Sequence, residues 1–85
     1  MDPNLTDGRP SPLDQAVAQD FLACYEESLA RLSSDQRRAA VLRLEFGASY
    51  LEIARALGRP SENAARLLTS RAILRLARLL KVHNS

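Results

Sequence analysis

The hydrophobic positions of the chain recur at intervals of three and four residues, which is the pattern of amphipathic helices. The first such stretch begins near residue 11, and its apolar positions are Leu13, Val17, Phe21, Cys24, Tyr25, Leu29 and Leu32. We expect these residues to form one buried face over about five helical turns. Ser11 is a suitable N-cap for this helix, and Pro12 fits its first position.

A second helix is predicted from about residue 34 to residue 46. Ser33 and Gln36 have the spacing of a capping box at its start, and Gly47 stands where a helix commonly ends. The positions expected to face the core are Ala40, Val41, Leu44 and Phe46.

A third, short helix is predicted over residues 50–57. Ser49 and Glu52 have capping-box spacing before it, and Gly58 follows it, where a left-handed residue ends many helices. The apolar positions of this helix fall on one face, and they are Ile53, Ala54 and Leu57.

A tight turn and a long fourth helix follow. Pro60 cannot prolong the third helix, and Ser61 is a suitable N-cap for a helix from about Glu62 to about Lys81. A short helix, a turn and a longer helix are the outline of a helix-turn-helix motif, whose second helix enters the major groove of DNA. An ordinary helical hairpin uses the same turn chemistry. The positions expected on the core side of the long helix are Ala65, Leu68, Ala72, Leu76 and Leu79.

Composition supports an all-α fold class. Leucine and alanine dominate, aromatic residues make up 5%, and no stretch alternates with the period of a β-strand. We expect a single four-helix domain over residues 12–82, with a C-terminal helix-turn-helix and a long recognition helix. Residues 1–11 are predicted to be a flexible tail or interdomain linker.

Charge is distributed unevenly along the chain, although the net charge is only +2. Residues 1–30 hold six acidic side chains and one basic one, whereas residues 53–81 hold seven basic side chains and one acidic one. A basic half that coincides with the helix-turn-helix favours a polyanionic partner. The alternative is an ordinary solvated face on a surface helix.

Side chains suited to DNA contact are concentrated around the predicted turn and the long helix. Arg66 and Asn63 can each make two hydrogen bonds to a base edge, and Glu62 can accept one from cytosine. Further candidates for contacts to bases or phosphates are Ser61, Thr69 and Ser70. Candidates for phosphate contacts are Arg37, Arg38, Arg59 and Arg71. Taken singly, each of these is more often an ordinary exposed polar residue.

Catalysis, cofactors and metals are not expected. The chain has one cysteine, Cys24, and one histidine, His83, which excludes an internal disulfide and a cysteine-based zinc cluster. No glycine-rich phosphate loop is present, and no serine or threonine has an evident partner base. No apolar run approaches the about 20 residues that span a membrane, and no signal peptide is evident. We therefore expect a cytoplasmic, non-enzymatic protein without a membrane partner.

A resemblance to a known family is carried by the run SLARLSSDQRRAAVLRLEFGASYLEIARALG and by NAAR and SRAILRL after it. These residues resemble domain four (region 4) of bacterial sigma-70 family factors, and most closely the extracytoplasmic-function group. The resemblance covers about residues 11–80. It implies that the last helix reads the minus-35 element of double-stranded promoter DNA and that the domain docks on the β flap of the RNA polymerase core.

The resemblance also implies which residues act. Arg37 and Arg38 match basic positions near the DNA backbone, and the apolar grooves between helices are where the flap or an anti-sigma factor binds. The implied promoter-reading residues are Ser61, Glu62, Asn63, Arg66, Thr69, Ser70 and Arg71.

Two features depart from the family pattern. The turn GRPSENAA is one residue longer than in many members. The sequence therefore defines the residues that contact bases only to within one position. Domain two, which melts the minus-10 element and carries the main polymerase contact, has no counterpart in these 85 residues. We therefore expect that this chain alone does not initiate transcription.

Two other functions remain open from the sequence. One is a protein-interaction module that binds an anti-sigma factor or RNA polymerase without sequence-specific DNA binding. The other is a non-sigma transcription regulator that dimerises through Leu67, Leu74 and Leu80. An Arg66→Ala variant distinguishes the interaction module from a DNA reader, because the substitution should abolish DNA binding by a reader and leave partner binding by a module intact. The molecular mass in solution shows whether the chain is a dimeric regulator.

Overall fold

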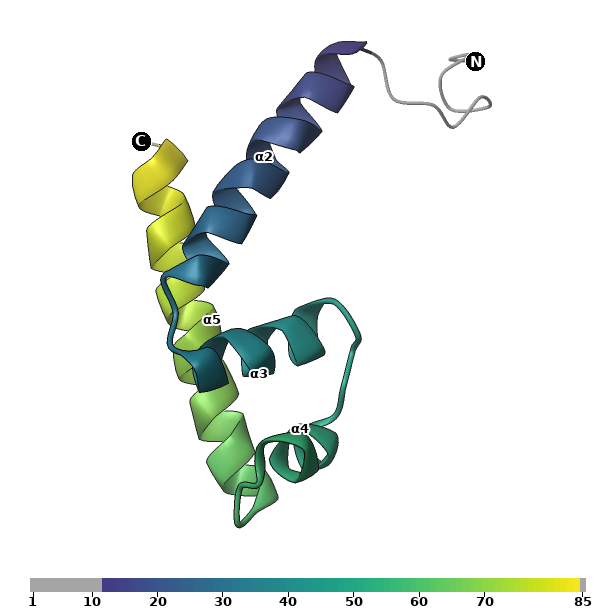
Figure 1. Cartoon of the computed structure of the whole chain (residues 1–85), viewed down its shortest axis with the longest axis vertical. Helices are drawn as coiled ribbons and strands as arrows, with labels where there is room; N and C mark the ends of the chain where they lie inside the picture. Colours follow the sequence, from purple (N-terminus) through teal and green to yellow (C-terminus); the bar gives the residue numbers. More distant parts are fainter. Residues whose placement is uncertain (1–11, 85) are drawn as a thin grey trace, which may run out of the picture.

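The computed structural model describes residues 12–84, and these residues form an all-α fold, as predicted. The elements are α2 (Pro12–Ala30), α3 (Ser34–Leu44), α4 (Tyr50–Leu57) and α5 (Glu62–Asn84) (Figure 1). The predicted cap Ser11 and the predicted tail over residues 1–11 lie outside the described residues. The predicted bounds of α4 are confirmed, whereas α3 ends before Phe46 and α5 continues beyond Lys81.

Helix α5 is the element against which α2, α3 and α4 all pack (Figure 1). Its buried side forms parts of two hydrophobic clusters. The first cluster joins the end of α2 to α3 and α5, and it contains Leu29, Leu32, Ala40, Ala72 and Leu76. The second joins α3, α4 and α5, and it contains Ala39, Ile53, Ala54 and Ala65. Many of these residues are alanines, so the helix backbones approach one another closely at the contacts.

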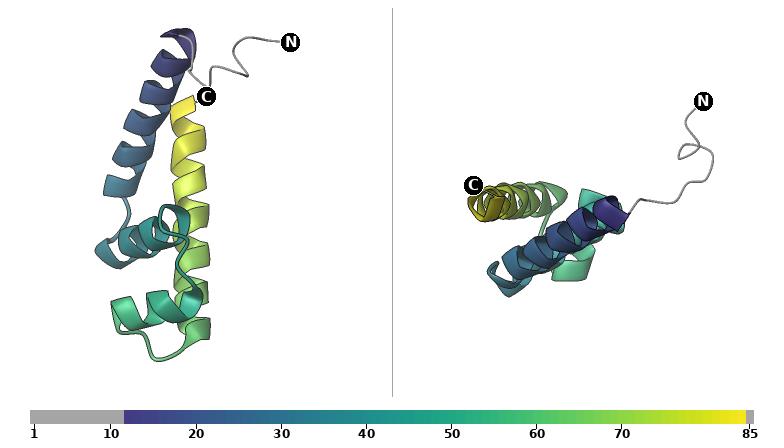
Figure 2. Two further views of the ribbon diagram at one scale, coloured as in Figure 1. Left: turned by 90° about the vertical axis from the view of Figure 1, so that its right-hand side faces the viewer. Right: turned by 90° about the horizontal axis from the view of Figure 1, so that it is seen from above.

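The N-terminal half of α2 extends away from the bundle, as Figures 1 and 2 show. The prediction of one continuous buried face on this helix was therefore wrong. Leu13 is 74% exposed, Val17 is 60% exposed and Phe21 is 50% exposed, while burial begins only near the C-terminal end of the helix. Cys24, expected to be buried, is half-buried. The physical reason is geometric: α2 and α5 diverge, so α5 packs against only the last turns of α2.

Tyr25 connects α2 to the end of α3. Its hydroxyl donates a hydrogen bond of 3.0 Å to a carboxylate oxygen of Glu45, and its ring stacks on Phe21 with centroids 6.1 Å apart. Burial raises the pKa of the Tyr25 hydroxyl, and the hydrogen bond and negative charge of Glu45 raise it further. The hydrogen bond to Glu45 helps to fix the direction in which α2 leaves the bundle, whereas the ring contact lies within α2.

The end of α3 differs from its prediction. Leu44 and Phe46 were expected to face the core, but they are 49% and 73% exposed. The helix ends at Leu44, and the chain then turns at Gly47, whose φ of +64° is a left-handed conformation. The buried residues of α3 are Ala39 and Ala40, and the end of the helix leads away from α5 (Figure 1), so Leu44 and Phe46 lie beyond the core.

The connection from α3 to α4 is held by Arg43. Its guanidinium donates a hydrogen bond of 3.0 Å to the Ala48 carbonyl and lies 4.3 Å from the centre of the Tyr50 ring. A cation over an aromatic face is attracted by the electron density of the ring. Arg43 therefore fixes the start of α4 relative to α3.

Candidate nucleic-acid interface

The predicted capping box at the start of α4 is confirmed. The Ser49 hydroxyl accepts from the Glu52 backbone N–H at 3.1 Å, and the Glu52 carboxylate accepts from the Ser49 backbone N–H at 2.8 Å. Hydrogen bonds from the Ser49 backbone and side chain lower the pKa of Glu52, and the positive charge of Arg55 lowers it further. These two hydrogen bonds fix the start of α4, the first helix of the helix-turn-helix, at Tyr50.

The capping box predicted at the start of α3 forms only in part. The Ser33 hydroxyl accepts from the Gln36 backbone N–H at 3.3 Å, as expected for an N-cap. The Gln36 side-chain oxygen is buried and has no hydrogen-bond partner among residues 12–84. The reciprocal bond from Ser33 is therefore missing.

The turn between α4 and α5 has the geometry that its sequence predicts. Gly58 has φ +66° and ψ 31°, the left-handed conformation. The Arg59 N–H donates to the Ala54 carbonyl at 2.8 Å, and the Gly58 N–H approaches the Arg55 carbonyl at 3.4 Å, which is the Schellman pattern. Gly58 thereby ends α4 and turns the chain towards α5.

Ser61 begins the long helix. Its hydroxyl accepts a hydrogen bond of 3.0 Å from the Ala64 backbone N–H, so it is the N-cap that the sequence predicted. The unpaired N–H groups of the first turn give this end of α5 a partial positive charge, which favours an anionic group nearby.

Four of the predicted DNA-binding residues come together at this end of α5. They surround a surface hollow of about 390 Å³, and they are Ser61, Glu62, Asn63 and Arg66. All four are exposed, and the Arg66 guanidinium donates a hydrogen bond of 2.7 Å to the Asn63 side-chain oxygen. Asn63 and Arg66, the two side chains best suited to reading base edges, therefore project from the same face of the helix.

Thr69 was predicted to contact DNA, and the structure contradicts this. The residue is completely buried, and its hydroxyl donates a hydrogen bond of 2.7 Å to the Ala65 carbonyl. Position 69 is four residues after Ala65 and three before Ala72, so it falls on the buried side of α5. Its neighbours Ser70 and Arg71 are exposed and remain candidates for DNA contact.

Arg59 was predicted to contact the DNA backbone, but here it forms an ion pair with Asp35 in the first turn of α3. Its side chain is 34% exposed, and its Nε is buried without a hydrogen-bond partner among the described residues. Arg59 therefore fixes the turn against α3 in this structure, and its guanidinium is engaged within the protein.

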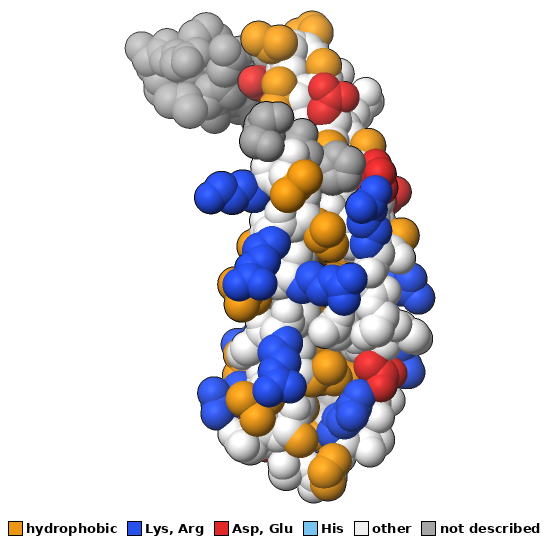
Figure 3. Space-filling view, turned by 90° about the vertical axis from the view of Figure 1, so that its left-hand side faces the viewer, with side chains coloured by type: hydrophobic (Ala, Val, Ile, Leu, Met, Phe, Trp, Pro, Cys, Tyr) orange, Lys and Arg blue, Asp and Glu red, His pale blue; other side chains and the backbone are white. Residues whose placement is uncertain are grey.

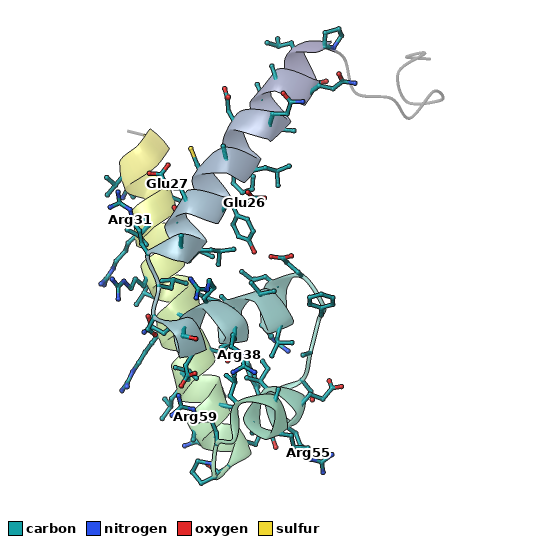
Figure 4. The ribbon with its side chains drawn as sticks, in the orientation of Figure 1. Glu26, Glu27, Arg31, Arg38, Arg55 and Arg59 are labelled. Atoms are coloured by element: carbon teal, nitrogen blue, oxygen red, sulfur yellow. The ribbon has the colours of Figure 1, made fainter. Side chains whose placement is uncertain are left out.

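Arg37 and Arg38 lie on α3, on the side that faces α4. Arg38 donates a hydrogen bond of 3.4 Å to the Ala56 carbonyl (Figure 4). Both arginines are exposed. Together they border a mostly apolar groove of about 400 Å³, which we call the α3–α4 groove. Its lining residues are Arg37, Arg38, Val41, Leu42 and Ala56. This groove combines an apolar floor with positive charge.

Basic side chains cover the outer face of α5. Figure 3 shows Lys and Arg side chains distributed along this face of the molecule, with few acidic side chains among them. The basic residues that α5 exposes are Arg66, Arg71, Arg75, Arg78 and Lys81. This face presents a positive potential to a polyanion.

The leucine surface predicted for dimerisation is not intact. Leu67 and Leu74 are 42% and 54% exposed, but Leu80 is half-buried and packs against the first hydrophobic cluster. This set of three leucines therefore does not form one exposed patch. Among residues 12–84, no helix combines the length and apolar character that crossing a membrane requires.

Comparison with known proteins identifies the family. Residues 22–76 match the family model described as Sigma-70, region 4. No curated protein and no solved structure gave a match. The matched residues include α3, α4 and the part of α5 that bears the predicted DNA-binding side chains. Region 4 domains act in promoter recognition and RNA polymerase binding, and they are not enzymes. The chain therefore belongs to region 4 of the sigma-70 family.

Proposed function

We propose that this domain reads the minus-35 element of promoter DNA, as the extracytoplasmic-function group does, by placing the first turns of α5 in the major groove. The observation that supports this most directly is the exposed pair of Arg66 and Asn63 beside the hollow at the N-terminal end of the helix. Helix-turn-helix proteins contact base edges with the N-terminal residues of their second helix.

The hydrogen bond between Arg66 and Asn63 prepares both side chains for base contact. Residues three apart in a helix are surface neighbours, so the bond holds the guanidinium and the amide on one face. Holding flexible side chains in place before binding reduces the entropy lost on binding. The buried residues Ala65 and Thr69 fix the helix from behind, so the pair has a defined orientation.

Phosphate contacts come from residues around this pair. Ser70 and Arg71 lie further along α5, and the helix N-terminus and Ser61 lie at its start. Arg37 and Arg38 on α3 provide a second basic site for the DNA backbone. Binding through so few contacts on a chain of net charge +2 is expected to be weak and strongly dependent on salt.

Attachment to RNA polymerase offsets this weak affinity by raising the effective concentration of the domain at the promoter. We propose that the α3–α4 groove receives the β flap of the polymerase core or, in its place, an anti-sigma factor. Its apolar floor, which includes Val41 and Leu42, suits an apolar segment of such a partner. A cytoplasmic location follows from this proposal, because RNA polymerase acts there.

Selection of DNA sequences by the wild-type domain at low salt tests promoter reading. We expect a discrete motif, and we expect Arg66→Ala to abolish it because the guanidinium reads a base directly. Arg31→Ala is the matched control, because Arg31 is an exposed arginine at the end of α2 (Figure 4). Salt-sensitive binding without any motif would contradict the proposal and leave only phosphate anchoring.

A second variant distinguishes DNA reading from a pure interaction module. Ala56 is exposed and lines the α3–α4 groove, so Ala56→Asp places a negative charge in the proposed docking site. We expect this variant to lose binding to RNA polymerase core, measured by co-purification, and to select the same DNA motif as the wild type. If the wild-type domain binds core and selects no DNA at all, the interaction module is the correct function.

A further inference from the structure

An exposed leucine lies among the side chains proposed to read DNA. Leu67 follows Arg66 directly in α5 and comes four residues after Asn63. Residues three or four apart on a helix are surface neighbours, so Leu67 adjoins Asn63 on one side and Ser70 on the other. Leu67 is 42% exposed and belongs to neither of the hydrophobic clusters that residues 12–84 form. The core therefore does not account for an apolar residue at this place.

The position of Leu67 in the helix directs its side chain outward. Ala65 and Thr69 are completely buried, and Leu67 is two residues from each of them. A step of two residues turns an α-helix by about 200°, so Leu67 lies on the side opposite both. The start of α5 is at the tip of the molecule, beside α4 (Figure 1). Leu67 thus faces whatever the first turns of α5 contact.

The chemistry of leucine limits what it can recognise in the major groove of DNA. Thymine alone presents an apolar group there, its 5-methyl group, and apolar side chains recognise it by direct contact. The other bases present hydrogen-bond donors and acceptors. Covering these with leucine would remove their water without replacing the hydrogen bonds. A leucine at this place on a reading helix therefore favours thymine over the other bases.

We infer that Leu67 contacts the 5-methyl group of a thymine in the DNA element that α5 reads, beside the base pairs contacted by Asn63 and Arg66. The inference rests on the proposed promoter reading and specifies one base of the element. Leu67 is five residues after Glu62, the first residue of α5, and therefore lies about 7.5 Å along the helix axis. This is within the first two turns, and the N-terminal residues of a recognition helix are those that reach base edges.

Leu74 is a second exposed leucine on the same face of α5. It is 54% exposed and comes seven residues after Leu67, which is about two helical turns. It therefore lies about 10 Å farther from the start of the helix, too far to meet the same base. The two residues are alike in chemistry and exposure and differ in position. Leu74 is accordingly the matched control for Leu67.

Removing the methyl groups of thymine one at a time tests the inference. Deoxyuridine pairs with adenine as thymine does and lacks the 5-methyl group. In the DNA that the wild-type domain selects, we expect one such replacement to weaken binding by about threefold to fivefold, the effect of one buried methyl group. Leu67→Ala should bind the two DNAs equally well, whereas Leu74→Ala should keep the wild-type preference. Fluorescence anisotropy at low salt measures the affinities, and circular dichroism checks that both variants are folded.

A conservative variant tests whether the contact is apolar. Leu67→Met keeps an apolar side chain of similar volume, so it should retain a preference for thymine over deoxyuridine that Leu67→Ala has lost. Loss of the preference in both variants would show that more than apolar contact is needed and would overturn the inference.

The outcomes separate this inference from the promoter reading on which it rests. A domain that selects a DNA motif and binds it equally well when each thymine is replaced would overturn the inference and leave the promoter reading intact. A preference that persists in Leu67→Ala would also overturn it, because the methyl group would then act through another side chain or through DNA shape. A domain that selects no motif would overturn the promoter reading and the inference together.

Discussion

The Arg59 guanidinium, in the turn of the helix-turn-helix, forms an ion pair with the Asp35 carboxylate in the first turn of α3. The two side chains are 34% and 47% exposed, so water screens much of their attraction. The pair nevertheless joins the turn to a helix that precedes the motif in the chain. It thereby links the position of the turn to the rest of the fold.

Replacing Asp35 with alanine should lower the free energy of unfolding by no more than about 1 kcal/mol, the range for exposed ion pairs. The same change releases Arg59, so DNA affinity at low salt should stay equal or rise slightly. Urea denaturation and a DNA titration measure the two effects. Glu26→Ala, which removes an exposed carboxylate from α2, is the control for the change in net charge. A fall in DNA affinity for Asp35→Ala alone would show that the pair orients the turn for binding.

Replacing Ser49 with alanine should destabilise the domain by about 1 kcal/mol, the usual cost of losing an N-cap side chain. The variant loses the bond from the Glu52 N–H to the Ser49 hydroxyl. Urea denaturation measures the difference. Ser70→Ala is the matched control, since Ser70 is an exposed serine within α5 and should change stability little. Equal effects of the two substitutions would contradict a role for the cap in stability.

Replacing Gly58 with alanine should cost about 1 kcal/mol, because a side chain disfavours the left-handed conformation. A Cβ atom placed at this position would meet no heavy atom within 4 Å, so the cost is conformational and not a clash. Gly58→Asn should therefore be less harmful than Gly58→Ala, since asparagine tolerates this conformation better. Thermal unfolding of the two variants measures the order, and the reverse order would contradict the explanation.

Replacing Thr69 with valine should lower stability by about 1 kcal/mol and leave the selected DNA motif unchanged. The variant keeps the shape of the buried side chain and removes its hydrogen bond to the Ala65 carbonyl. Chemical denaturation and DNA selection measure the two properties separately. A changed motif with unchanged stability would instead return Thr69 to the DNA-reading surface.

Acid should weaken the cap of α4. Because the folded state lowers the pKa of Glu52, the stabilisation by its carboxylate is complete above the ordinary value of 4.5 and is lost as pH falls through the lower folded value. Glu52→Gln should accordingly be less stable than the wild type at neutral pH, and the difference should shrink between pH values of about 5 and 3. Urea denaturation across this range measures it. Glu26→Gln, which removes an exposed carboxylate from α2, is the control for the loss of one negative charge.

Local features of the fold were predictable because a few neighbouring residues determine them. The capping bonds of Ser49 and Ser61 and the left-handed Gly58 depend only on residues close by in the chain, so the limits of α4 and the start of α5 were predicted correctly. The fold class and the family were likewise evident from periodicity and from the sequence of the motif.

Features that depend on contacts between distant residues were not predictable. The apolar repeat of Leu13, Val17 and Phe21 indicates a buried face, but the direction of α2 leaves that face uncovered. Arg59 is partnered by Asp35 from a helix that sequence periodicity does not place next to the turn. Thr69 is a different case, because its spacing from Ala65 and Ala72 already indicates the buried side of α5, and only its polar character suggested DNA contact.

The two sides of α5 have separate tasks, and this affects how the domain can evolve. Ala65, Ala72 and Leu76 hold the helix in the core, while Asn63 and Arg66 project into solvent. Substitutions on the outer side change little of what stabilises the fold. Under the proposed function, new promoter preferences can therefore arise through single outer substitutions, while the inner residues preserve the scaffold. A set of paralogues could in this way serve different genes with one architecture.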